Sequence, residues 1–306
     1  MRAVEALLTG LIDYAGLFPP AGEDMRPALE NYAGYRSGPD RWALGRFIVP
    51  VARLSELEAE AKDLMPRGRR DEPWQLAVLA ADDIPGAVKQ ISEFNRRHEP
   101  GSKRGHAIID VVELKATTGD QIIAQRRELP ESLTPYFELP LGGNVAPLVE
   151  RVARVGGRAK MRTGGIAPDS FPTADSILDF LAACHQNAVP FKATAGLHHP
   201  VGGEYRLTYE PDPPRGTMYG YLNVFLAAAF IYDGGDEDSA LALIEEHDSS
   251  TFEFADDAIT WREKRLSAEQ IGAARARFAI AFGSCSFREP VDELNHLTRN
   301  PRVTDK

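Results

Sequence analysis

Short apolar segments that return at a regular interval constrain the fold of this chain more than any other feature. From residue 46 onward, runs rich in β-branched and aromatic residues alternate with amphipathic stretches that have helical spacing. The first six runs begin about thirty residues apart, which is the length of one strand–helix unit. We therefore predict strands at residues 46–51, 74–80, 107–115, 135–141, 158–162, 190–194 and 278–284.

Repeated strand–helix units with nearly continuous apolar strands predict a parallel sheet that is covered on both faces. Seven strands are one short of a (β/α)8 barrel of the TIM type, which is the fold we expect. An open doubly wound sheet is the alternative. The segment from 200 to 277 offers a buried helix at 217–232, a helix at 240–247 and a hairpin-like stretch at 252–261. We expect a distorted barrel or an insertion after the sixth strand, and the position of the seventh strand stays open.

Residues 1–45 precede the first predicted strand–helix unit. A helix is predicted at 1–11, and the aromatic, proline-rich segment 12–20 could cap a barrel mouth or form a strap across its bottom. We expect one domain over 1–306, with a cap at 1–45, the barrel at 46–290 and a tail at 291–306. Capping-box patterns at Ser55 and Ser267 predict two helix starts, because the serine and the Glu or Gln three residues later can satisfy free amides.

Charge and cysteine content limit the function and the location of the protein. The formal net charge of -10, without a Lys/Arg-rich stripe, disfavours nucleic-acid and anionic-membrane partners. The longest apolar run, 219–232, is shorter than a membrane span of about 20 residues. Two cysteines and no secretory signal pattern are typical of a cytoplasmic protein. The sequence leaves open whether the chain forms a homo-oligomer.

Two lysines, Lys160 and Lys192, stand near the ends of neighbouring predicted strands, and each is followed by a glycine-containing turn. Apolar or small neighbours desolvate an ammonium group and lower its pKa, which makes a lysine a nucleophile or a base. Because parallel strands end at the same edge of a barrel, we expect both lysines at the mouth where such folds carry their chemistry.

Other polar residues follow the same strand ends and complete the predicted site. We assign proton transfer to Glu138 and His198, beside Lys160 and Lys192 as catalytic residues. Small and hydroxyl residues in the turns favour binding of an anion. The predicted substrate-binding residues are Glu113, Lys115, Arg162, Thr163, Gly164, Thr194, His199 and Ser284. We interpret Cys285 as a buried or substrate-lining thiol and Cys184 as a core residue.

The segment Phe191-Lys192-Ala193-Thr194-Ala195-Gly196 resembles the Lys-x-Thr-x-Gly strand end of deoxyribose-phosphate aldolase, a class I aldolase barrel. The resemblance covers under ten residues. It implies that Lys192 forms the Schiff base and that a second lysine, here Lys160, lowers the pKa of the first by like-charge repulsion. In that family the second lysine follows the Schiff-base strand, whereas Lys160 precedes Lys192.

We expect a cofactor-free carbon–carbon lyase or isomerase that uses a lysine and acts on a small anionic carbonyl compound. One alternative is a divalent-metal-dependent isomerase or hydrolase on the same barrel, with Glu113, Glu138 and His198 as ligands. A second alternative is a non-catalytic barrel that binds a small molecule. The chain has no glycine-rich nucleotide-binding motif.

Overall fold

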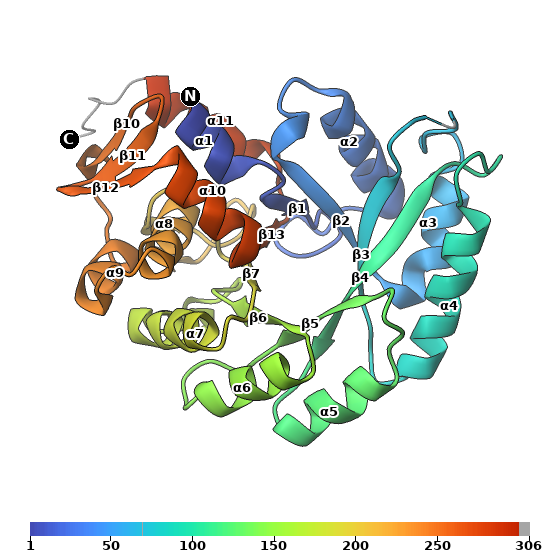
Figure 1. Ribbon diagram of the computed structural model, residues 1–306. Helices are drawn as coiled ribbons and strands as arrows, with labels where there is room; N and C mark the ends of the chain where they lie inside the picture. Colours follow the sequence, from blue (N-terminus) through green and yellow to red (C-terminus); the bar gives the residue numbers. More distant parts are fainter. Residues whose placement is uncertain (69, 300–306) are drawn as a thin grey trace.

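A computed structural model of the chain describes residues 1–68 and 70–299. Eight parallel strands close into a barrel with the order β1-β13-β7-β6-β5-β4-β3-β2, and helices surround it (Figure 1). The barrel strands are β1 (Ile12–Tyr14), β2 (Leu44–Pro50), β3 (Trp74–Leu79), β4 (Ala107–Lys115), β5 (Thr134–Glu138), β6 (Arg158–Arg162), β7 (Phe191–Thr194) and β13 (Ala279–Ser284). The predicted (β/α)8 barrel is confirmed.

The eighth strand lies near the N-terminus, in a segment where no strand was predicted. Ile12–Tyr14 pairs with β13 on one side and with β2 on the other, so it closes the barrel. The barrel therefore begins at residue 12, and the predicted boundary at residue 46 is wrong. Three residues between a helix and a proline-rich loop are too few to show strand periodicity.

The helices cover the outer face of the barrel, and their bounds follow local signals in the sequence. They are α1 (Arg2–Leu8), α2 (Met25–Ser37), α3 (Leu54–Glu60), α4 (Ile84–Arg97), α5 (Gly119–Arg127), α6 (Ala146–Arg154), α7 (Ala174–Gln186), α8 (Tyr221–Tyr232), α9 (Glu237–Ile244), α10 (Ala268–Arg277) and α11 (Arg288–Arg299). Ser267 caps α10 in the predicted capping box with Gln270. The capping box at Ser55 is wrong, because α3 begins one residue earlier, at Leu54.

A long insertion separates β7 from β13, as the spacing predicted. It contains a two-stranded sheet of β8 (Gly203–Arg206) and β9 (Arg215–Met218), followed by α8 and α9. A three-stranded antiparallel sheet of β10 (Phe252–Phe254), β11 (Ala258–Trp261) and β12 (Lys264–Ser267) follows, which confirms the predicted hairpin. Helix α8 is buried over most of its length, and the amide of Asn223 within it is fully hydrogen-bonded to the backbone.

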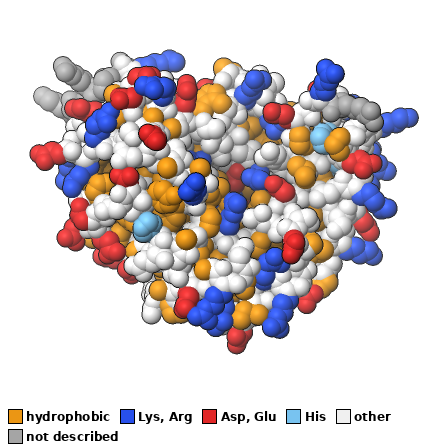
Figure 2. Space-filling model, in the orientation of Figure 1, with side chains coloured by type: hydrophobic (Ala, Val, Ile, Leu, Met, Phe, Trp, Pro, Cys, Tyr) orange, Lys and Arg blue, Asp and Glu red, His pale blue; other side chains and the backbone are white. Residues whose placement is uncertain are grey.

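Within the described residues no helix is both long and apolar enough to cross a membrane. Lysine and arginine side chains are interspersed with acidic ones over the face drawn in Figure 2. Part of the predicted tail is the helix α11, and residues 300–306 lie outside the described part of the chain.

Candidate active site

Five charged side chains form a continuous network inside the barrel mouth. Lys160 Nζ lies 2.7 Å from Glu113 Oε2 and 2.8 Å from Glu138 Oε2. Lys192 Nζ lies 2.7 Å from Glu113 Oε1 and 2.5 Å from Asp13 Oδ2. Glu113 therefore bridges the two lysines, with one oxygen on each. The predicted gathering of Glu113, Glu138, Lys160 and Lys192 at one end of the barrel is confirmed.

Strand register brings these side chains together. Glu138 is aligned with Lys160 across β5 and β6, and Lys160 is aligned with Lys192 across β6 and β7. Glu113 lies on β4, the neighbour of β5, and Asp13 lies on β1, which only β13 separates from β7. An apolar cluster of Ile48, Ala77, Val111 and Tyr136 fills another part of the barrel interior, and Lys192 Nζ stands 5.6 Å from the Tyr136 ring.

Burial and ion pairing act in opposite directions on the charges of the network. Burial raises the pKa of Glu113, but the two ammonium groups outweigh it and lower this pKa to about 2. Burial lowers the pKa of Lys192, yet the carboxylates of Asp13 and Glu113 outweigh it and raise this pKa above its ordinary value. The predicted neutral Lys192 amine is therefore wrong, because two carboxylates hold the proton on its nitrogen.

A pocket of about 370 Å³ opens directly above the network. Glu113, Glu138, Lys160, Lys192, Thr194 and His198 all line it. Apolar residues also line it and form an apolar wall that includes Ala15, Phe18, Pro19 and Pro20. The segment 12–20 therefore contributes a strand, β1, and then a wall of the mouth, and it is not a strap across the barrel bottom.

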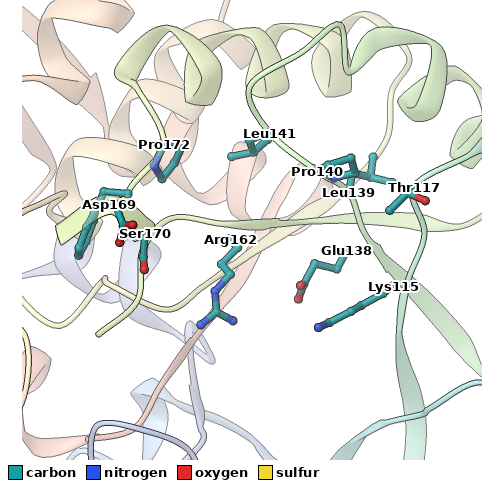
Figure 3. A pocket seen from close by; sticks show the side chains of 11 residues that line it. Lys115, Thr117, Glu138, Leu139, Pro140, Leu141, Arg162, Asp169, Ser170 and Pro172 are labelled. Atoms are coloured by element: carbon teal, nitrogen blue, oxygen red, sulfur yellow. The ribbon is translucent and has the colours of Figure 1, made fainter. Parts of the chain in front are cut away.

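A second cavity of about 390 Å³ adjoins the first and shares Lys115, Glu138 and Arg162 with it. In Figure 3 the carboxylate of Glu138 lies between the Arg162 guanidinium and the Lys115 ammonium group. Both cations are exposed, and neither forms an ion pair within the part of the chain that the structure describes. Their charges are thus available to an anionic group of a ligand.

Four residues predicted to bind substrate do not line either cavity. The Thr163 hydroxyl donates to the carbonyl of Ala195 at 2.6 Å, and Gly164 packs against the Phe171 ring. His199 and Ser284 contact other residues of the protein and so point away from the cavities. His199 Nδ1 lies 2.9 Å from Glu293, and Ser284 is buried with its hydroxyl 3.3 Å from the Ser286 amide.

The predicted metal ligands Glu113, Glu138 and His198 do not form a metal site. Both oxygens of Glu113 bind lysines, and His198 Nδ1 contacts Glu289 Oε2 at 3.2 Å. Among the described residues, His199, Glu289 and Glu293 bring potential ligand atoms within 4.8 Å of one another. Hydrogen bonds from both histidines and from Tyr209 already satisfy these carboxylates without an ion.

Asp13 belongs to this site and was not among the predicted residues. Asp13 is buried on β1, where one carboxylate oxygen binds Lys192 and the other accepts a hydrogen bond from the Arg46 amide at 2.7 Å. A lone acidic residue inside an apolar stretch was the available signal, but the strand itself was not recognised.

Comparisons with protein-family models, curated proteins and solved structures find no match to this chain.

Proposed function

We propose that this protein is a carbon–carbon lyase or isomerase that acts on a small anionic carbonyl compound through a lysine imine. The observation that carries the proposal is the buried pair of lysines at the floor of the mouth pocket, joined by Glu113. Burying five charges is unfavourable unless they are paired, and a network with two lysines and three carboxylates offers proton transfer as well as pairing.

Lys160 is the better candidate for the imine-forming residue. Lys192 is held as a cation by Asp13 and Glu113, and its side chain is only 2% exposed. Lys160 shares Glu113 and has Glu138 as its second partner, whose side chain is 16% exposed and borders both cavities. Transfer of a proton from Lys160 to Glu138 leaves a neutral amine next to the pocket.

Lys192 and Glu138 then have separate roles. Lys192 keeps a fixed positive charge on the other oxygen of the Glu113 carboxylate that Lys160 contacts. Glu138 returns the proton to the oxygen that leaves as water when the carbinolamine becomes an imine. This assignment also agrees with the order in the aldolase resemblance, where the second lysine follows the Schiff-base strand.

The charges at the rim of the pocket support an anionic substrate. Arg162 offers a planar fork that suits carboxylate or phosphate, and Lys115 adds a point charge on the other side of Glu138. The apolar wall at Phe18 and Pro19 leaves little to hydrogen-bond the rest of the ligand. A small carbonyl compound with one terminal anion fits both features.

Trapping with borohydride tests the imine. The protein is mixed separately with pyruvate and with glyceraldehyde 3-phosphate, reduced with sodium borohydride, and mapped by peptide mass spectrometry. We expect a covalent adduct on Lys160 that disappears in Lys160→Arg, because arginine keeps the charge but cannot form the imine. Lys192→Arg should retain the adduct, since a cation remains beside Lys160.

Lys89→Arg is the matched control, because Lys89 is exposed on α4 and should leave trapping unchanged. An adduct on Lys192 alone would reverse the two roles within the same mechanism. Binding of these compounds without any adduct would favour the non-catalytic barrel. Turnover that requires an added divalent metal would favour the metal-dependent alternative.

The two free cysteines support a reducing, cytoplasmic setting for this chemistry.

A further inference from the structure

A cysteine and a histidine face each other at the mouth pocket, apart from the lysine network. Cys285 follows β13 and His198 lies in the loop after β7, and both line the 370 Å³ pocket. Cys285 Sγ lies 3.9 Å from His198 Nδ1, and Glu289 Oε2 lies 3.2 Å from the same nitrogen. The three groups have the chemistry of a nucleophile, a base and an orienting carboxylate.

We propose that Cys285 is a nucleophilic thiol, with His198 as the group that takes its proton, and that it adds reversibly to the carbonyl carbon of an aldehyde in the pocket. The sulfur–carbon bond forms as the carbon–oxygen π bond breaks. The thiol proton passes to His198 and then to the carbonyl oxygen, which gives a hemithioacetal. No oxidant or cofactor takes part.

The surroundings of His198 favour its protonated form. Burial lowers the pKa of His198, but contacts with Cys285 and Glu289 outweigh it and raise this pKa to about 10. A cationic imidazole beside a cysteine favours the thiolate. Because Cys285 and Glu289 meet the same ring nitrogen, Glu289 stabilises the imidazolium and does not relay a proton through the ring.

Two other titratable side chains face this group. The Tyr209 hydroxyl lies 3.8 Å from Cys285 Sγ and donates to Glu289 Oε2 at 3.2 Å. His199 binds Glu293 beside this group. Burial raises the pKa of Glu289, but the contact with His198 outweighs it and lowers this pKa. The thiol is therefore next to the His198 imidazole and the Tyr209 phenol, and both of these contact the Glu289 carboxylate.

The second cysteine of the chain is an internal control. Cys184 is fully buried on α7, where burial alone raises its pKa well above the ordinary value. Alkylation of the native protein by iodoacetamide therefore distinguishes the two thiols within one molecule. The cysteine sulfur displaces iodide from the reagent, and this reaction does not require enzymatic turnover.

We expect Cys285 to be alkylated at pH 6 about tenfold faster than the thiol of glutathione, because an ordinary thiol is almost fully protonated there. Cys184 should react only after unfolding. His198→Gln should reduce the Cys285 rate to that of glutathione, while His199→Gln, which removes the neighbouring imidazole, should have a smaller effect. Peptide mass spectrometry gives both rates.

Thiolate absorbance at 240 nm provides a second measurement that does not depend on access of a reagent. The difference between the wild type and Cys285→Ser should show thiolate below pH 7, and His198→Gln should remove it. A Cys285 without thiolate below pH 8, or one whose thiolate is unchanged in His198→Gln, would overturn the proposal.

The aldehyde is tested with glycolaldehyde as the probe. It should protect Cys285 from iodoacetamide in the wild type and equally in Lys160→Arg, which cannot form the proposed imine. Loss of protection in Lys160→Arg would mean that the aldehyde is bound as an imine and not by the thiol. The inference rests on the proposed function only for the kind of ligand that enters the pocket. Failed borohydride trapping and failed thiol protection are separate results.

Discussion

The two ends of the barrel stabilise buried positive charge with different partners. At the mouth, Lys192 is surrounded by the carboxylates of Asp13 and Glu113. At the opposite end, Arg275 of α10 donates to the backbone carbonyls of Leu7 and Thr9 before β1 and of Ala279 and Ile280 in β13. A carboxylate can accept a proton at ordinary pH, whereas a backbone carbonyl cannot.

This difference separates a site that can change its protonation from one that can only hold its shape. Burial lowers the pKa of Arg275 to about 10, which still leaves the guanidinium charged near neutral pH. Arg275 therefore ties α1 and the residue that follows it to β13 as a fixed clamp. The mouth instead contains five groups that can exchange protons, and it opens to the 370 Å³ pocket.

The largest expected effect is that of Lys192→Met on stability. The substitution leaves the buried carboxylates of Asp13 and Glu113 without their shared cation. Removing one partner of a buried ion pair destabilises a protein by about 3–5 kcal/mol. Urea unfolding should show this loss in the free energy of unfolding, whereas Lys89→Met on the exposed face of α4 should change it by less than about 0.5 kcal/mol. A loss below about 1 kcal/mol would mean that the network is not a structural unit.

Acid should weaken the mouth through Glu113. Its pKa is about 2 in the folded protein and near 4.5 without the fold, so the unfolded chain binds more protons at low pH. The stabilisation is complete above about pH 5 and is lost as the pH falls through 2, with a total of about 3 kcal/mol. Urea unfolding between pH 5 and 2.5 measures this slope. Glu113→Gln should have a shallower slope; an equal slope would assign acid sensitivity to other carboxylates.

The sequence predicted the barrel because its apolar runs recur at the length of a β/α unit. The predicted strand at 107–115 and that at 158–162 have the observed bounds. Residues near strand ends, such as Glu113 and Lys160, were predictable because parallel strands all end at one mouth. Strand β1 was not predictable, since three residues carry no measurable period. Asp13 lies on this strand and was therefore not predicted as a site residue.

The charge state of Lys192 could not be predicted from the sequence for a related reason. Its local neighbours are apolar or small, which suggested a neutral amine. The carboxylates that hold its proton are far away in the chain, 79 residues distant for Glu113 and 179 for Asp13. Local composition predicts desolvation, but only the closed barrel determines which charges oppose it. The prediction that Gly164 binds substrate was wrong for a similar reason. This glycine leaves room for the Phe171 ring rather than for a ligand.

The smallest of the three expected effects is that of Arg275→Met at the closed end of the barrel. The variant keeps much of the side-chain volume and removes hydrogen bonds to the carbonyls of Leu7, Thr9, Ala279 and Ile280. Each hydrogen bond to a charged group contributes about 1.5–3 kcal/mol, but burial of the guanidinium opposes most of their sum, so we expect a net loss of about 2 kcal/mol in urea unfolding.

The pH dependence of this variant decides whether the two ends are independent. Because no carboxylate is a hydrogen-bond partner of Arg275 among the described residues, its loss should be constant between pH 5 and 2.5. Arg277→Met, at an exposed position two residues away on α10, is the matched control and should change stability by less than about 0.5 kcal/mol. A loss that fades with acid would show that Arg275 stabilises the fold through the field of Asp13, and the clamp would then belong to the mouth network.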